Sequence, residues 1–214
     1  MNLYFIRHGQ TVYNAAHIVQ GWTDVDLTKK GRAQAAGAAK LVAPISFEKI
    51  YASDLQRTKT TAGIIFGDAD IIWDKRLREI NNTPFAGLTS KEMLDRFGDD
   101  YDYARSHLDY GRLGAESSES LILRVGNFMA SIVSEYEGDT RKCSSKKCGN
   151  IAVVTHGGVI HAAIANVLGI GIDVRRISIS NCSVSVFNYS EGFWKIMSLN
   201  HTADSIINPE AILY

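Results

Sequence analysis

The chain has 214 residues, a length that favours one domain with a sizeable insertion over two independent domains. Its 23 Lys and Arg balance 23 Asp and Glu, so the formal net charge is zero and we expect no general attraction to nucleic acid or to an anionic membrane. A hydrophobic share of 45% and a charged share of 21% argue against intrinsic disorder.

The sequence also lacks the signals of an exported or membrane-spanning protein. No apolar stretch has the length of a membrane-spanning helix. The chain reaches Arg7 and His8 before the apolar region of a secretory signal could form. Three cysteines are too few for a disulfide-stapled scaffold and fit a reducing compartment. We therefore expect a cytoplasmic protein.

Short apolar runs alternate with longer helical patterns in the first third of the chain, as in an α/β domain with a mainly parallel sheet. The predicted strands are residues 2–7, 47–52 and 69–73. The predicted helices are residues 29–42, capped by Thr28, and residues 54–66.

Residues 74–116 interrupt this alternation, and we interpret them as a lid insertion within a single domain that spans residues 1–214. Two short helices are predicted in the lid segment, at 91–97 and 100–108. The residues that break regular structure before them are Asn81, Asn82, Pro84 and Gly87.

A long amphipathic helix follows, capped by Ser117 or Ser118. Its predicted core stripe is Leu121, Val125, Phe128, Met129, Ile132, Val133 and Tyr136. The remaining predicted elements are a buried strand at 150–155, a helix at 159–168 and a hairpin formed by 181–189 and 193–199. The predicted fold is an α/β three-layer sandwich, in which helices flank a mixed, mostly parallel sheet.

Two predicted strands run directly into a His-Gly pair, His8-Gly9 and His156-Gly157. Ligands of open α/β sheets bind beyond the carboxyl ends of the strands, so neighbouring strands would direct both imidazoles into one pocket. Gly157 opens a helix whose free N–H groups favour an anion, and Arg7 adds positive charge. These features together predict a phosphate site.

Each of these residues also has an ordinary structural explanation when it is taken alone. A single histidine at a strand end is usually structural. Arg57 alone reads as a solvent-exposed ion-pair partner, and Asn14 and Gln20 read as loop amides. It is their arrangement relative to Arg7 and His8 that favours a functional site.

Arg7-His8-Gly9, followed by Gln10, Thr11 and Asn14, resembles the signature of the histidine phosphatase superfamily, which has the phosphoglycerate-mutase-like fold. The resemblance covers most of residues 1–170, with its motifs in the family's order. The further matching motifs are Gln20-Gly21, Asp26-Leu27-Thr28, Gly31, Gln34-Ala35, Ala52 to Thr58, Leu77-Arg78-Glu79-Ile80, Gly114 to Ser117, and Thr155-His156-Gly157-Gly158.

The resemblance implies that His8 attacks phosphorus and forms a phosphohistidine, which water then hydrolyses. It implies that a backbone carbonyl near Gly9 accepts a hydrogen bond from the other ring nitrogen. Arg7, Arg57 and His156 would bind the phosphate oxygens. The residues implied to add neutral contacts are Asn14, Gln20, Gly21 and Gly157. The scheme requires neither a metal nor another cofactor.

Glu79 is implied as the general acid that protonates the leaving alcohol. Without the resemblance it could be a surface residue beside Arg76 and Arg78. The sequence departs from the family pattern at Ala86, where an acidic residue is common. Glu116 is expected to have a minor role facing the substrate.

We predict a phosphomonoesterase acting on a small phosphorylated metabolite, with a phosphoglycerate mutase as the first alternative and a non-enzymatic binding module as the second. Residues 80–116 contain few of the basic residues expected of a mutase, only Lys91, Arg96, Arg105 and Arg112. In the lid segment, Tyr101, Tyr103, His107 and Tyr110 could suit an aromatic or sugar-like group or could simply pack. A homodimer is possible from the sequence.

Cys143 and Cys148 lie in a polar, basic loop. Their spacing is compatible with half of a zinc site, but no second ligand pair is evident. We therefore expect a solvated loop and no metal site.

Overall fold

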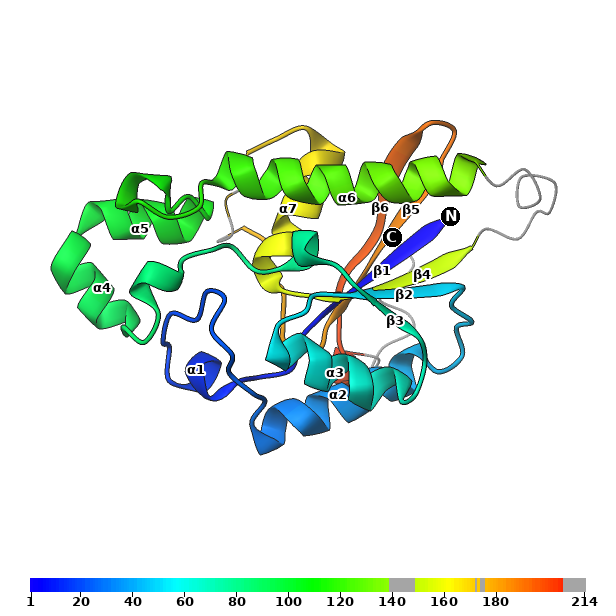
Figure 1. The fold of residues 1–214 in the computed structure, drawn as a ribbon, viewed down its shortest axis with the longest axis horizontal. Helices are drawn as coiled ribbons and strands as arrows, with labels where there is room; N and C mark the ends of the chain where they lie inside the picture. The colour runs from blue at the N-terminus through cyan, green and yellow to red at the C-terminus, as the bar shows by residue number, and fades with distance from the viewer. Residues whose placement is uncertain (139–148, 172, 174–175, 206–214) are drawn as a thin grey trace.

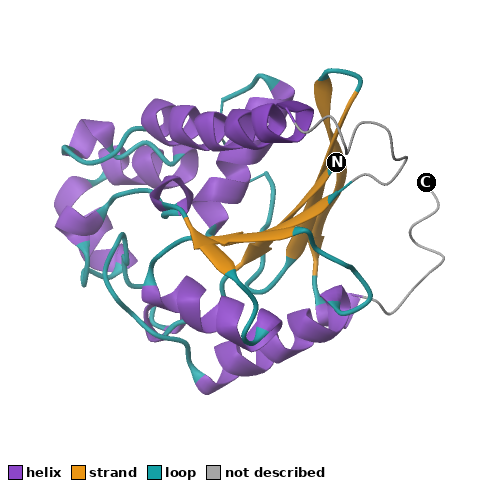
Figure 2. Cartoon of the chain, turned by 45° about the vertical axis from the view of Figure 1, so that its right-hand side comes forward, coloured by secondary structure: helices purple, strands orange, loops and turns teal. Residues whose placement is uncertain are grey.

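A computed structural model describes residues 1–138, 149–171, 173 and 176–205, which form a six-stranded sheet with helices on both faces (Figure 1, Figure 2). The strand order is β3-β2-β4-β1-β5-β6. The strands are β1 (Asn2–Arg7), β2 (Lys49–Ala52), β3 (Ile71–Trp73), β4 (Asn150–Thr155), β5 (Val184–Ser190) and β6 (Phe193–His201). The first four pair in parallel, whereas β5 and β6 are antiparallel. The predicted fold class is confirmed.

Seven α-helices and four short 3-10 helices accompany the sheet in the described residues. The α-helices are α1 (Val12–Ala15), α2 (Lys29–Val42), α3 (Gln56–Phe66), α4 (Ser90–Phe97), α5 (Asp99–His107), α6 (Ser118–Gly138) and α7 (Gly157–Leu168). The 3-10 helices are η1 (Lys75–Leu77), η2 (Thr83–Phe85), η3 (Gly111–Leu113) and η4 (Ala203–Ser205). Within the described ranges, no helix combines the length and the apolar character needed to cross a membrane.

Alternate side chains of the central strand pack on opposite faces of the sheet. Leu3 and Phe5 of β1 belong to the large core that includes α6 and α7. Tyr4 and Ile6 instead join a smaller core with Val42 of α2. A strand with helices on both sides must be apolar on both, which explains why the predicted strands read as continuous apolar runs.

The predicted elements are present in the predicted order, but several begin elsewhere. The strands predicted from 47 and 69 begin at Lys49 and Ile71, and the helix predicted from 54 begins at Gln56. The strand predicted from 181 begins only at Val184, because Cys182 lies in the left-handed region at a φ of 57° and interrupts extended backbone.

The helix ends follow local capping. The helix predicted from 159 begins at Gly157, because extended His156 precedes its first turn. Thr28 caps α2 as predicted, since its Oγ1 accepts a 3.0 Å hydrogen bond from the Gly31 amide. Of the two candidate serines, Ser117 caps α6, with a 3.2 Å bond from the Ser120 amide.

The lid segment connects β3 to α6, and its helices α4 and α5 lie at one end of the molecule (Figure 1). Backbone hydrogen bonds attach it to the loop after α1: the Val19 amide donates to Leu88 at 2.9 Å, and the Gly87 amide donates to Val19 at 3.1 Å. This attachment places the lid segment opposite the carboxyl end of β1.

Two glycines allow the start of α2 to pack against the residues after His8. A Cβ at Gly31 would lie 2.1 Å from the Gln10 carbonyl oxygen, and a Cβ at Gly9 would lie 2.4 Å from the Gly31 carbonyl oxygen. A backbone carbonyl oxygen cannot move aside in the way that the end of a flexible side chain can. These two positions therefore require glycine for lack of space.

We predict that Gly31→Ala lowers the free energy of unfolding by about 2 kcal/mol, because its methyl group must displace backbone. The matched control is Gly63→Ala in α3, where an added Cβ meets no atom within 4 Å. The control should be stabilised by about 0.5 kcal/mol through the lower entropy of the unfolded chain. Urea unfolding of both variants measures the difference, and equal stability would contradict the close approach.

Candidate active site

The carboxyl ends of β1 and β4 lie side by side and bring His8 and His156 together. Arg7 pairs with Thr155 in the parallel register, so the residue after each strand faces the same space. The two imidazole centroids are 5.2 Å apart, and both rings are buried. The expected adjacency of the two His-Gly pairs is therefore observed.

The surroundings of His8 keep its ring neutral. Its Nδ1 lies 2.7 Å from the Gly9 carbonyl oxygen, which can only accept, so Nδ1 carries the proton and Nε2 retains its lone pair. Burial lowers the pKa of His8 well below its ordinary value, and the charges of Arg57 and Arg7 lower it further. A neutral imidazole with a free Nε2 is the form that attacks phosphorus.

Arg57 is 1% exposed, so its interpretation as a surface ion-pair residue is wrong. Its guanidinium donates to the carbonyl oxygens of Gly21 at 2.8 Å and Thr23 at 3.2 Å. Burial lowers the pKa of Arg57 to about 10, which leaves the group charged at neutral pH. The charge of Glu79 opposes this shift.

His156 uses both of its ring nitrogens within the protein. Nδ1 accepts from Arg57 Nε at 3.2 Å, so the neutral ring carries its proton on Nε2 and donates it to Ser53 Oγ at 2.9 Å. Burial, followed by the charge of Arg57, lowers the pKa of His156 well below its ordinary value. A phosphate oxygen would receive the Nε2 proton only by replacing Ser53 Oγ.

Arg7 has hydrogen-bonding capacity available for an anion. Its Nη1 donates to the Ile179 carbonyl oxygen at 2.5 Å. Its buried Nε has no acceptor within the described part of the chain. A Cβ at Gly157 would lie 3.4 Å from that nitrogen, an ordinary contact distance, so the guanidinium lies against the N-terminus of α7. An anion here would meet both the arginine and the helix dipole.

Glu79 lies against the same helix N-terminus. Its carboxylate accepts from the Ile80 amide at 2.9 Å and from the Gly158 amide at 3.3 Å. A Cβ at Gly158 would lie only 2.2 Å from Glu79 Oε1, so glycine is required for this approach. These two backbone N–H groups hold the carboxylate beside the cavity.

Asn14, Gln20 and Gly21 line the cavity as expected, and each forms a different hydrogen bond within the protein. Asn14 Oδ1 accepts from the Thr11 amide at 3.1 Å, and Gln20 Oε1 accepts from Thr11 Oγ1 at 2.9 Å. Their NH₂ ends are therefore the ends that can donate to a ligand. Gly21 positions Arg57 through its carbonyl oxygen.

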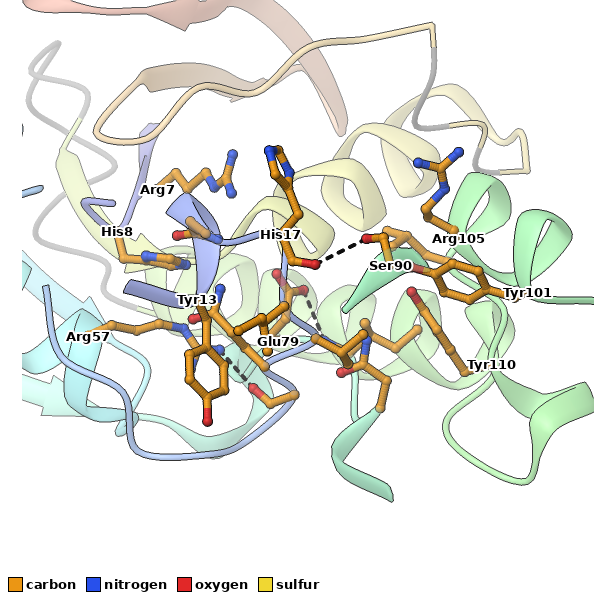
Figure 3. A pocket seen from close by; sticks show the side chains of 18 residues that line it. Arg7, His8, Tyr13, His17, Arg57, Glu79, Ser90, Tyr101, Arg105 and Tyr110 are labelled. Carbon is orange, nitrogen blue, oxygen red and sulfur yellow. Dashed lines mark hydrogen bonds between the residues drawn. The ribbon is translucent and has the colours of Figure 1, made fainter. Parts of the chain in front are cut away.

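A cavity of about 420 Å³ lies between the sheet and the lid segment (Figure 3), and His156 and Gly157 are not among the residues that line it. Arg7, His8 and Arg57 come from the sheet side, while Tyr101, Arg105 and Tyr110 come from the lid segment (Figure 3). The other lining residues are Tyr13, Asn14, His17, Ile18, Val19, Gln20, Gly21, Glu79, Ile80, Asn82, Ser90 and Leu108. The lining thus contains three arginines and one carboxylate.

The aromatic residues of the lid segment divide into two groups. Tyr101 and Tyr110 line the cavity. Tyr103 and His107 stack on each other with centroids 4.3 Å apart, and the Arg112 guanidinium lies 4.0 Å from the Tyr103 ring centroid. Packing therefore explains Tyr103 and His107, as the second interpretation of the sequence allowed.

Sequence reasoning missed several residues that support the site. Asn181 Nδ2 donates to the His8 carbonyl oxygen at 2.9 Å, and Trp22 Nε1 donates to the Glu79 carbonyl oxygen at 2.7 Å. Glu116, expected to face the substrate, instead accepts from the Asn81 amide at 2.7 Å and pairs with Arg124 at 2.7 Å. No local pattern marks such partners, because they meet only in the folded chain.

The sequence predicted no metal site, either at the phosphate site or in the loop that contains Cys143 and Cys148. The described ranges contain no cluster of three or more His, Cys, Asp or Glu suited to a metal ion. Cys143 and Cys148 lie outside the described residues, so the expectation for their loop stays a prediction.

A comparison with protein families decides the classification. The model of the histidine phosphatase superfamily, branch 1, matches residues 3–202. The chain belongs to this superfamily. A probable phosphoglycerate mutase GpmB from Enterobacter sp. (strain 638) is 34% identical over 203 residues, which cover 91% of this chain and 87% of the relative.

Solved structures of other histidine phosphatases have the same fold. Bacillus stearothermophilus YhfR superposes with a TM-score of 0.80 and 28% identity, covering 92% of this chain and 95% of that one. A mycobacterial glucosyl-3-phosphoglycerate phosphatase, solved with VO3, has a TM-score of 0.81 and 25% identity, covering 94% and 99%.

The two buried histidines predict how stability depends on pH. Both have a pKa lowered in the folded chain, so unfolded protein binds more protons as the pH falls below the ordinary histidine pKa of about 6.5. Each of the two histidines then lowers the free energy of unfolding by up to about 1.4 kcal/mol for each pH unit of acidification. His8→Asn should make this slope shallower, measured by urea unfolding between pH 7 and 5. An unchanged slope would show that His8 binds its proton in the folded protein.

Proposed function

We propose that this histidine phosphatase hydrolyses the phosphate monoester of a small metabolite through a phosphohistidine on His8. The observation that supports this most is the neutral His8 ring, bonded through Nδ1 to Gly9, beside the guanidinium groups of Arg7 and Arg57. The proposed nucleophile and the two guanidinium groups that would stabilise the phosphate charge thus face one cavity before any substrate binds.

In the first step His8 Nε2 attacks phosphorus and the bond to the ester oxygen breaks. Arg7 and Arg57 bind the phosphate oxygens, and the leaving oxygen takes its proton from Glu79. In the second step Glu79 accepts a proton from water, whose oxygen attacks phosphorus and releases phosphate and neutral His8. Because the arginines supply the positive charge, the proposed reaction needs no metal ion.

A mutase would use the same residues but would return the phosphoryl group to the substrate. The names of the curated relatives favour this alternative. The lid segment favours hydrolysis: of the four basic residues between positions 80 and 116, Arg105 lines the cavity and is also paired with Asp102. Lys91 pairs with Asp95, and Arg112 covers Tyr103. The described lid thus offers few cations for a second acidic group of a phosphoglycerate.

We predict that phosphate release exceeds isomerisation across a panel of phosphorylated metabolites assayed in EDTA. With 3-phosphoglycerate and a trace of bisphosphate primer, little 2-phosphoglycerate should form. Acid-labile, base-stable phosphoenzyme should appear after rapid quenching of the wild type and be absent from His8→Ala. Isomerisation far faster than phosphate release would favour the mutase, and a loss of activity in EDTA that Mg²⁺ restores would contradict the metal-free scheme.

The role of Glu79 predicts a dependence on the leaving group. Glu79→Gln should lower kcat/KM for an alkyl phosphate by about 10²- to 10⁴-fold, because an alkoxide needs a proton to depart. An aryl phosphate with a stable phenolate should lose less than about tenfold. Steady-state assays measure both ratios, and burst kinetics separate formation of the phosphoenzyme from its hydrolysis. Equal small losses with both esters would remove Glu79 from the mechanism.

A further inference from the structure

We propose that Arg124, on α6, is a positioning residue that sets the location of Glu79. This inference rests on the proposed function, since it assigns Arg124 a role through the general acid. Arg124 does not line the cavity, and it comes from a different element of the fold.

The backbone around Glu79 lacks the regular hydrogen bonds of a helix or strand. Residues 78 and 79 follow η1 in irregular structure, yet four successive carbonyl oxygens, those of residues 76 to 79, accept from side chains. Arg124 donates to Arg76 at 2.8 Å, Arg78 at 2.5 Å and Glu79 at 2.9 Å. Thr155 Oγ1 donates to the Leu77 carbonyl at 2.8 Å. One guanidinium therefore supplies most of the donors that this backbone needs.

Arg124 has no donor left for a substrate. Its Nε and Nη2 bond the two Glu116 oxygens at 2.7 and 3.1 Å, and its remaining three N–H groups reach the three carbonyls. A guanidinium has five N–H groups, and all five are used. Glu116 also accepts from the Asn81 amide, so it orients the guanidinium and fixes the far side of the same segment.

Glu79 is held by hydrogen bonds at both its side chain and its backbone. Its carboxylate accepts from the Ile80 amide at 2.9 Å and from the Gly158 amide at 3.3 Å. Its carbonyl oxygen receives two donors, Arg124 Nη2 at 2.9 Å and Trp22 Nε1 at 2.7 Å. Proton transfer requires a donor within hydrogen-bond reach of the leaving oxygen, so loosening this backbone should weaken the acid and spare the nucleophile.

Lysine is the informative substitution. Arg124→Lys retains a positive charge but presents three N–H groups from one atom, and these cannot span three carbonyls and a carboxylate. We expect kcat/KM for an alkyl phosphate to fall at least tenfold, and kcat/KM for an aryl phosphate to change less than about threefold. The matched control is Arg32→Lys on α2, where Arg32 forms an exposed ion pair with Asp26. In this variant the ratio of kcat/KM for the alkyl phosphate to kcat/KM for the aryl phosphate should not change.

A double-mutant cycle separates positioning from a general structural effect. If Arg124 acts through Glu79, then Arg124→Lys should cause little further loss for the alkyl ester in a Glu79→Gln background. Trp22→Phe removes one donor to the Glu79 carbonyl without disturbing α6, and it should show the same selectivity at about threefold. It therefore provides a test if Arg124→Lys does not fold.

The outcomes distinguish this inference from the proposed function. One outcome would overturn the positioning role alone. In that outcome Glu79→Gln lowers kcat/KM more for the alkyl than for the aryl phosphate, whereas Arg124→Lys lowers it equally for both. Additive losses in the double mutant would also overturn the positioning role. If Glu79→Gln shows no selectivity, both the acid assignment and this inference fail, whereas phosphoenzyme on His8 would still support the phosphatase.

Discussion

The site depends on two guanidinium groups held beside a neutral imidazole at the end of β1. Arg7 and Arg57 lower the pKa of His8 in addition to the effect of burial. Their desolvation is offset by carbonyl oxygens, those of Ile179, Gly21 and Thr23. The same charges that keep His8 deprotonated would attract the phosphate, so one electrostatic arrangement supports both binding and nucleophilicity.

This arrangement explains why the parallel pairing of β1 with β4 matters for chemistry. Their register brings His8 next to His156 and next to the N-terminus of α7. The helix also provides the Gly158 amide as a donor to Glu79, which comes from the lid segment. The proposed nucleophile and the proposed acid are thus both positioned relative to β1 and β4, two strands in the centre of the sheet.

Hydrolysis and isomerisation differ in the fate of the phosphohistidine and not in its formation. The residues that would form it are shared, so a comparison of these residues cannot separate the two activities. The proposal of hydrolysis therefore rests on the lid segment, which lines the cavity where the substrate would bind. Here it offers Tyr101, Tyr110 and a single arginine, Arg105, which already has an acidic partner.

Much of the fold was predictable from local patterns. Continuous apolar runs predicted β1 and β4, the spacing of three and four predicted α6, and Thr28 marked the start of α2. These features follow from residues close together in sequence. The boundaries of the elements were harder to predict. Cys182 is an example, because its left-handed conformation has no sequence signature and β5 begins only after it.

The candidate site residues His8, His156 and Glu79 were also identifiable in the sequence, through motifs that resemble those of the superfamily and follow its order. Burial of Arg57 was not, since a helix position near a strand end does not reveal what covers it. The five hydrogen bonds of Arg124, two to Glu116 and three to carbonyl oxygens of residues 76, 78 and 79, were equally hidden. The sequence by itself determined which groups could react. Only the tertiary structure decided how they are held, because those bonds join residues that are far apart in the chain and become neighbours only when the core packs.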